Sequence, residues 1–157
     1  MTIQKLSFCL WFDNQAEEAA KFYTSIFKNS VMGQISRYGK EGFEIHHMPE
    51  GTVMVASFTL SGIDFMALNG GPVFTFNESI SIVIHCDNQE EIDYFWSRLT
   101  QGGKESQCGW LKDKFGVSWQ VVPVILPQLL SDPSKAQRVT KAFLQMKKFD
   151  IEKLKQA

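Results

Sequence analysis

The sequence lacks a charge excess, paired cysteines and any long hydrophobic run, and each absence excludes a class of protein. The net charge of −1 gives no general attraction to nucleic acid or anionic lipid, so we expect neither partner. The three cysteines, Cys9, Cys86 and Cys108, lack the spacing of metal ligands and predict reduced thiols in a cytoplasmic protein. No segment has the length and apolarity of a membrane span, and we expect no signal peptide.

Apolar and aromatic residues are plentiful by contrast. They make up 44% and 13% of the sequence, with thirteen phenylalanines and four tryptophans, so an ordered core is expected. A chain of 157 residues with this composition fits one domain with one sizeable core. We therefore predict a single domain over residues 1–157.

A short internal repeat indicates that this domain contains two copies of one module. The tripeptide Asp-Asn-Gln occurs at residues 13–15 and again at 87–89, about half the chain apart. Each copy follows an apolar, strand-like run and precedes an amphipathic helix pattern. In the first copy, Asn14 and Glu17 have the spacing of a capping box. Duplicated modules form sites where the halves face each other, so we expect the function there.

The first module is predicted to fold as β-α-β-β-β. Apolar alternation predicts a strand over residues 5–12, and a buried helical stripe predicts a helix over 17–27. Glycines then separate strands predicted over 31–38, 52–60 and 63–68.

The second module repeats this plan before the chain becomes helical. A strand over 79–85 and a helix over 89–101 precede two or three strands that end near residue 122. Further helices are predicted to start at Asp132-Pro133 and at Asp150. The predicted parts are module one over about 1–70, module two over about 76–124 and C-terminal helices over about 127–157.

Strand parity separates the side chains that face the helices from those that face away. Four strands from each half could form one curved sheet, with a cleft on the side opposite the helices. Its mixture of polar and aromatic side chains suits a small-molecule pocket, although a partner chain or the C-terminal helices could equally cover this face. The predicted helix-facing side chains are Leu6, Phe8, Leu10, Phe12, Ile80, Ile82 and Ile84; the predicted cleft-facing ones are Ser7, Cys9, Trp11, Ser79, Ser81, Val83 and His85.

Several segments resemble the glyoxalase, bleomycin-resistance and extradiol-dioxygenase superfamily, also called the vicinal oxygen chelate superfamily. They include Leu10-Trp11-Phe12-Asp13, residues 65–72, residues 108–113 and residues 118–123. Within the superfamily the chain is similar to the PhnB-like branch, labelled 3-demethylubiquinone-9 3-methyltransferase-like. The resemblance covers essentially the whole chain. It implies an α+β fold of paired βαβββ modules forming a curved mixed sheet with C-terminal helices, and a homodimer whose chains could exchange modules through residues 69–77.

Metal-using members of the superfamily place a ligand, usually His or Glu, on the first and last strand of each module. By position, those sites fall at Ser7 or Phe8, Met66, Ser81 and Gln120. Neutral hydroxyl, amide and thioether groups are poor ligands for divalent transition metals. We therefore expect no metal and no other cofactor.

The remaining histidines have a functional and a structural interpretation. If Glu44 and His46 lie on a strand they share one face while His47 points away, so a surface hairpin is favoured over a metal site. His85 could transfer a proton or bind a ligand, but it could also simply hydrogen-bond the following turn.

Two tryptophans and one cysteine also have a functional and a structural interpretation. Trp119 has helix-facing parity and is predicted to be core, whereas Trp110 could equally close over a planar ligand. Cys108 has no base fixed near it in the sequence and is a weak candidate nucleophile. The Gly70-Gly71 pair lacks the strand-turn-helix context of a phosphate loop, and no glycine-rich cofactor fingerprint supports methyl transfer.

The leading hypothesis is a metal-free PhnB-like protein that binds a small, partly apolar molecule in the cleft. Alternatives are a metal-dependent lyase, isomerase or dioxygenase that recruits Glu44, His46 or His85, and a binding protein that sequesters its ligand. Whether the protein is an enzyme is left open. The predicted ligand-binding residues are Ser7, Trp11, Met66, Ser81, His85, Trp110 and Gln120.

Overall fold

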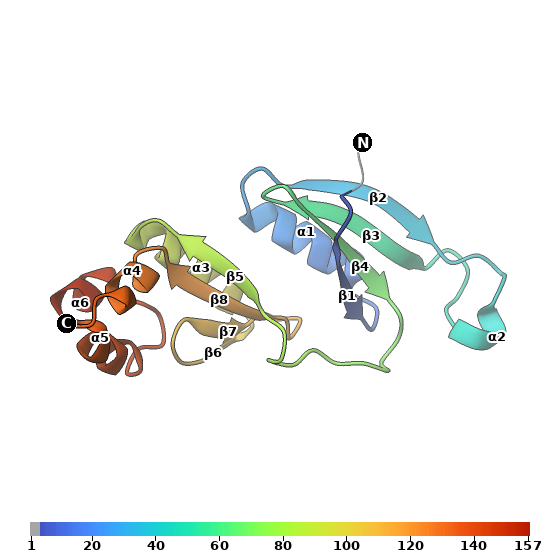
Figure 1. Cartoon of the computed structure of the whole chain (residues 1–157). Helices are drawn as coiled ribbons and strands as arrows, with labels where there is room; N and C mark the ends of the chain where they lie inside the picture. Colours follow the sequence, from blue (N-terminus) through green and yellow to red (C-terminus); the bar gives the residue numbers. More distant parts are fainter. Residues whose placement is uncertain (1–3) are drawn as a thin grey trace. The chain divides into compact units, whose positions relative to one another are not determined.

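The computed structural model describes residues 4–157 and divides the chain into two compact units, Met1–Thr75 and Phe76–Ala157 (Figure 1). The strands form two four-stranded mixed sheets, where the sequence predicted one curved sheet shared by both halves. The predicted β-α-β-β-β order is present in each unit, which confirms an α+β fold built from two modules. Among the described residues, no helix is both long and apolar enough to cross a membrane.

In the first unit one helix packs on a sheet with the strand order β1-β4-β3-β2. Strand β1 runs parallel to β4, and the other neighbours are antiparallel. Figure 1 shows α1 lying along one face of this sheet. The elements are β1 Phe8–Phe12, α1 Ala16–Ile26, β2 Val31–Arg37, α2 Phe43–His46, β3 Val53–Leu60 and β4 Ile63–Asn69.

A row of stacked rings forms the core between α1 and this sheet. Tyr23 of α1 stacks on Phe58 with ring centroids 6.1 Å apart, and Phe58 stacks on Phe65 at 5.4 Å. Phe8 extends the row with a centroid 5.2 Å from Phe65. The helix-facing parity predicted for Phe8 and Phe12 is therefore confirmed, and Phe12 is buried.

The predicted capping box at the start of α1 is wrong. The N-cap residue is Gln15, and it makes no side-chain capping bond. Instead Asn69, at the end of β4, accepts a hydrogen bond from the Ala16 N–H at 2.8 Å and donates one to the Val53 carbonyl at 3.0 Å. Because β4 runs parallel to β1, its end arrives beside the helix start and supplies the missing acceptor.

The connection between β2 and β3 contains the short helix α2, so Glu44 and His46 do not lie on a strand. Gly42 (φ 79°) and His47 (φ 55°) flank it in the left-handed region and allow the chain to enter and leave a single turn. Both ring nitrogens of His46 have partners within this loop. Nδ1 accepts from the Met48 N–H at 2.9 Å, and Nε2 is 3.2 Å from the Glu41 carbonyl.

The second unit has the sheet order β5-β8-β7-β6, with β5 parallel to β8. Helix α3 buries Ile92, Trp96 and Leu99. Trp119 is fully buried, as predicted, and its Nε1 donates to Asp113 Oδ2 at 2.8 Å. The elements are β5 Ile82–Cys86, α3 Gln89–Thr100, β6 Lys104–Glu105, β7 Trp110–Lys112, β8 Ser118–Pro123, α4 Leu126–Ser131, α5 Ala136–Phe143 and α6 Ile151–Gln156.

Two predicted boundaries in this unit need correction. Strand β5 begins at Ile82, so Ser79 and Ser81 precede it; the N–H of Ser79 bonds the Asn77 side chain in a local turn that competes with the sheet. Helix α4 begins at Leu126, close to residue 127 where the C-terminal helices were predicted to begin; the helix predicted to start at Asp132-Pro133 is α5, which begins at Ala136. The predicted start of α6 at Asp150 is confirmed, since its side chain accepts from the Lys153 N–H.

The segment between α5 and α6 is hydrogen-bonded to the turn before β7. The N–H groups of Cys108 and Gly109 donate to the carbonyls of Met146 and Lys147, both at 2.7 Å. A side chain at position 109 would collide with the ring of Phe149, because its Cβ would lie 2.5 Å from a ring carbon. The C-terminal helices are thus an integral part of the second unit.

Candidate functional site

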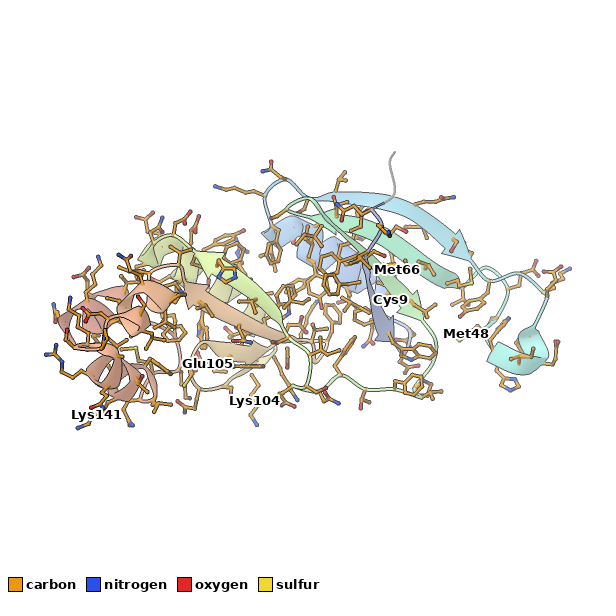
Figure 2. All side chains as sticks on the ribbon, viewed as in Figure 1. Cys9, Met48, Met66, Lys104, Glu105 and Lys141 are labelled. Carbon is orange, nitrogen blue, oxygen red and sulfur yellow. The ribbon has the colours of Figure 1, made fainter. Side chains whose placement is uncertain are left out.

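The face of the first sheet opposite α1 carries Met66 with Cys9 beside it. These residues are register partners on β1 and β4, and Ser57 of β3 lies on the other side of Met66 (Figure 2). Partial burial raises the pKa of the Cys9 thiol above its usual value of 9.0, so the thiol is neutral at pH 7. It has no activated nucleophilic character.

Trp11 lies on β1, like Cys9, and it contacts the segment that follows β4. Its Nε1 donates to the Gly71 carbonyl at 2.9 Å, and Phe74 meets the indole edge-on at 5.0 Å. A Cβ at Gly70 would lie 2.1 Å from the indole, which explains why glycine occupies that position. The predicted residue Ser7 precedes β1 and is exposed.

Three of the predicted ligand-binding residues come together on the face of the second sheet opposite α3. Trp110 on β7 is the register partner of Gln120 on β8, and Gln120 Nε2 donates to Ser81 Oγ at 2.9 Å. His85 lies further along β5, opposite Val122, and is exposed.

The residues at the positions where the sequence resemblance implied metal ligands do not fit a divalent transition metal. Ser81 and Gln120 offer neutral oxygens and bond each other, while Met66 offers a thioether. Such donors do not offset the desolvation of the ion. Within residues 4–157 there is also no group of three or more His, Cys, Asp or Glu side chains placed to hold a metal.

A pocket of about 430 Å³ lies beside Trp110 at the β6–β7 edge of the second sheet. Trp110 is the one predicted site residue among its lining side chains. The other charged or reactive side chains that line it are Glu78, Lys104, Glu105, Cys108, Lys112 and Ser118. Of these, the sequence pointed only to Cys108, as a weak candidate nucleophile; the others were not predicted because the pairing of β6, β7 and β8 brings them together.

Ser118 is the unusual member of this pocket. The residue is 2% exposed, and within the described part of the chain its hydroxyl has no hydrogen-bond partner. Buried polar side chains are nearly always bonded, so an unpaired one facing a pocket points to a ligand. Its position two residues before Gln120 gives both side chains the same strand parity, which is the sequence signal that could have identified it.

A charged pair completes the pocket. Lys112 Nζ lies 2.6 Å from Glu78 Oε1, and this hydrogen bond lowers the pKa of the Glu78 carboxyl below its usual value. Cys108 Sγ lies 3.7 Å from the Phe143 carbonyl. No base contacts that thiol among the described hydrogen bonds, so nucleophilic catalysis gains no support here.

A larger groove of about 710 Å³ lies between the start of α3 and the C-terminal segment. Its polar groups are largely paired with each other. Gln89 accepts from the Ile151 N–H and donates to the Phe149 carbonyl, and Lys148 forms an ion pair with Asp93 at 2.5 Å. None of the predicted site residues lines this groove. It is the seam that joins the C-terminal segment to the module, and the smaller pocket is the better candidate site.

Comparisons with known proteins agree with this architecture. A family described as 3-demethylubiquinone-9 3-methyltransferase matches residues 4–122. The structure of a PhnB protein from Bacillus cereus is 39% identical, with a TM-score of 0.68, over 77% of this chain and 100% of that one. A comparison with curated proteins gives no match.

Two more distant structures share the fold alone. Protein PA1353 from Pseudomonas aeruginosa is 20% identical, with a TM-score of 0.59, over 78% of this chain and 98% of that one. The fosfomycin resistance protein FosX from Listeria monocytogenes, complexed with Mn(II) and sulfate, is 16% identical, with a TM-score of 0.52, over 77% of this chain and 92% of that one. The chain therefore belongs to the PhnB-like family described as 3-demethylubiquinone-9 3-methyltransferase.

Proposed function

We propose that this protein binds a small, partly apolar molecule on the open face of its second module, without a metal ion. The observation that carries this proposal is the pocket beside Trp110 with the unpaired, buried hydroxyl of Ser118. The indole offers apolar contact area, and the Ser118 hydroxyl offers a hydrogen bond that orients a ligand, while the Ser81–Gln120 pair lies on the same face of the sheet outside the pocket lining.

Metal-free binding is supported by the donor chemistry of this face. Ser81 and Gln120 occupy positions where metal-using relatives of the superfamily supply His or Glu, and a hydroxyl and an amide are weak ligands for such ions. Methyl transfer is not part of the proposal, despite the family's description. No glycine-rich cofactor fingerprint supports it.

A small-molecule screen followed by variants of Trp110 tests the proposal. We expect thermal-shift hits whose affinity falls at least about tenfold in Trp110→Ala, since a buried aromatic contact contributes roughly 1.4 kcal/mol or more. Tyr94→Ala is the matched control, because Tyr94 is an exposed aromatic on α3 and lines neither pocket. Hits unaffected by Trp110→Ala would contradict this site.

Elemental analysis of the purified protein separates this function from a metal-dependent lyase, isomerase or dioxygenase. A stoichiometric transition metal lost in Gln120→Ala would overturn metal-free binding and favour the metal-dependent alternatives. If a bound molecule is held tightly and recovered unchanged, the protein acts by sequestration; conversion of that molecule would show an enzyme.

We also propose that the protein acts as a cytoplasmic homodimer, in which chains could exchange modules through residues 69–77. Val83, exposed on the open face of the second sheet, and Ile80, exposed just before β5, support a partner chain. The three free cysteines suit a reducing compartment.

A further inference from the structure

Two lysines occupy directly opposed positions at the edge of the second sheet. Lys104 on β6 is the register partner of Lys112 on β7, and Lys112 is in turn the partner of Ser118 on β8. The three side chains therefore form one row across neighbouring strands, and all three line the pocket of about 430 Å³. Figure 2 marks Lys104 on this edge strand. Like charges directly opposite each other on antiparallel strands are destabilising, so this row calls for an anion.

The nearby carboxylates of Glu78 and Glu105 supply this negative charge only in part. Glu105 follows Lys104 but is engaged elsewhere, since it accepts from the Trp96 indole at 2.8 Å and lies 3.6 Å from Lys147. Glu78 contacts Lys112, but its side chain is 63% exposed, and exposed ion pairs contribute little. Two lysines and two carboxylates thus line the pocket, but Glu78 pairs with Lys112 and Glu105 with Lys147, so neither carboxylate forms an ion pair with Lys104 among the described residues.

Ser118 adds a directional hydrogen-bond donor to this charge. Its hydroxyl is buried without a partner at the inner end of the row. A ligand oxygen that accepts this proton would remove the free-energy penalty of an unpaired buried group. Trp110, two residues from Lys112 on the same face of β7, provides an aromatic surface next to the charged row.

We propose that this pocket binds the anionic head group of the ligand, a carboxylate or a phosphate-type oxyanion, with an aromatic or apolar body against Trp110. This inference rests on the proposed binding function and specifies its ligand class. Lys104 and Lys112 attract the anion, Ser118 donates a hydrogen bond, and the ligand replaces Glu78 as the partner of Lys112. Glu78 consequently acts as an internal competitor of the ligand.

Binding of benzoate, phenylphosphonate and the neutral analogue benzamide to the full chain tests this inference. Each is titrated while the indole N–H signals are followed by NMR, and the two anions distinguish a carboxylate from a phosphate-type ligand. We expect the better anion to bind at least about tenfold more tightly than benzamide and to shift the Trp110 signal, because charge-assisted hydrogen bonds are the stronger ones.

Single variants give the direction of each contribution. We expect the affinity for the better-binding anion to fall at least about threefold in each of Lys104→Gln, Lys112→Gln and Ser118→Ala. In Glu78→Gln the affinity should rise by a similar factor, since one competing charge is removed. Lys141→Gln on α5 is the matched control, because it removes the same charge outside the pocket and should change nothing. The melting temperature of each variant verifies that it is folded.

The outcomes separate this inference from the function on which it rests. Equal affinities for benzamide and the anions, with a shifted Trp110 signal, would overturn the anion inference and leave small-molecule binding intact. Weaker binding in Glu78→Gln, or equal losses in Lys112→Gln and Lys141→Gln, would overturn it as well. If no probe binds at about 10 mM, a concentration at which even affinities near 4 kcal/mol are detected, the inference is wrong, and the library screen decides the function separately.

Discussion

Asn69 and Ser118 are two buried polar residues whose different hydrogen bonding gives them different roles. Asn69 uses its carbonyl oxygen and its amide to satisfy two backbone groups of its own unit, and it is 2% exposed. Ser118 is also 2% exposed, but its hydroxyl has no hydrogen-bond partner within the described part of the chain. Since an unpaired buried group lowers the stability of the folded state, the first residue serves the fold and the second keeps a donor free for something else.

Asn69→Ala should lower the free energy of unfolding by about 2–4 kcal/mol, because it leaves the Ala16 N–H and the Val53 carbonyl buried without partners. Urea denaturation measures this loss. Asn14→Ala is the control: Asn14 is exposed and does not cap α1, so its change should stay within about 0.5 kcal/mol. A larger loss in Asn14→Ala than in Asn69→Ala would show that Asn14 caps the helix in solution.

The repeated Asp-Asn-Gln tripeptide shows that equal sequence does not give equal structure at the level of elements. In the second copy Asn88 caps α3 by accepting from the Glu91 N–H, and the Glu91 carboxylate accepts from the Asp87 N–H. This is a variant of the capping box that the sequence placed in the first copy, because the Glu91 carboxylate bonds the N–H of the residue before the N-cap instead of that of Asn88 itself. There the acceptor comes from Asn69, a residue distant in sequence, which no local pattern could reveal.

Periodicity predicted the elements whose position depends on one buried face. The alternation in β1 and the stripe in α1 lead directly to the row of stacked rings that includes Phe8 and Tyr23. The single turn of α2 and the late start of β5 depend on local turn chemistry at Gly42 and Asn77, which periodicity does not report.

The candidate site, like the elements, could be predicted only in part from the sequence. Strand parity alone predicted that Ser81 lies on the open side of its sheet, and the family resemblance pointed to Gln120. The structure brings both residues together with Trp110. The opposed lysines and Ser118 depend on which residues pair across β6, β7 and β8. Strand register of this kind is set by contacts between distant parts of the sequence, so the sequence pattern could not supply it.

The C-terminal segment should be essential to the second unit. Phe149 is buried against Gly109 and Phe143, so Phe149→Ala should cost about 3–5 kcal/mol and loosen the turn that holds Cys108 beside the pocket. Thermal or urea denaturation measures the loss. Leu144→Ala removes a neighbouring side chain that is 53% exposed and should be nearly neutral. Equal effects of the two substitutions would mean that the segment is not docked in solution.

At the scale of the whole molecule, each module covers one face of its sheet with its own helix. That helix leaves the opposite face of the sheet uncovered. In the first unit this open face carries Cys9 and Met66, and in the second it carries Val83 and Gln120. A protein with duplicated open faces gains by burying part of them against another chain, and a homodimer with twofold symmetry is the commonest way to do so. The exposed side chains on these faces are the basis on which the dimer is proposed.

Light scattering coupled to size exclusion should give a mass twice that of the 17.9 kDa chain. Val83→Glu should convert this dimer to monomers, because a carboxylate buried at an interface without a partner costs several kcal/mol, roughly the stability of a modest dimer. Tyr94→Glu places the same charge at a residue of similar exposure, 40% against 42%, on α3 rather than on the open face, and should leave the dimer intact. A wild-type mass of one chain would refute the dimer outright. Equal dissociation by both variants would place the interface elsewhere, since only the open face distinguishes the two substitutions.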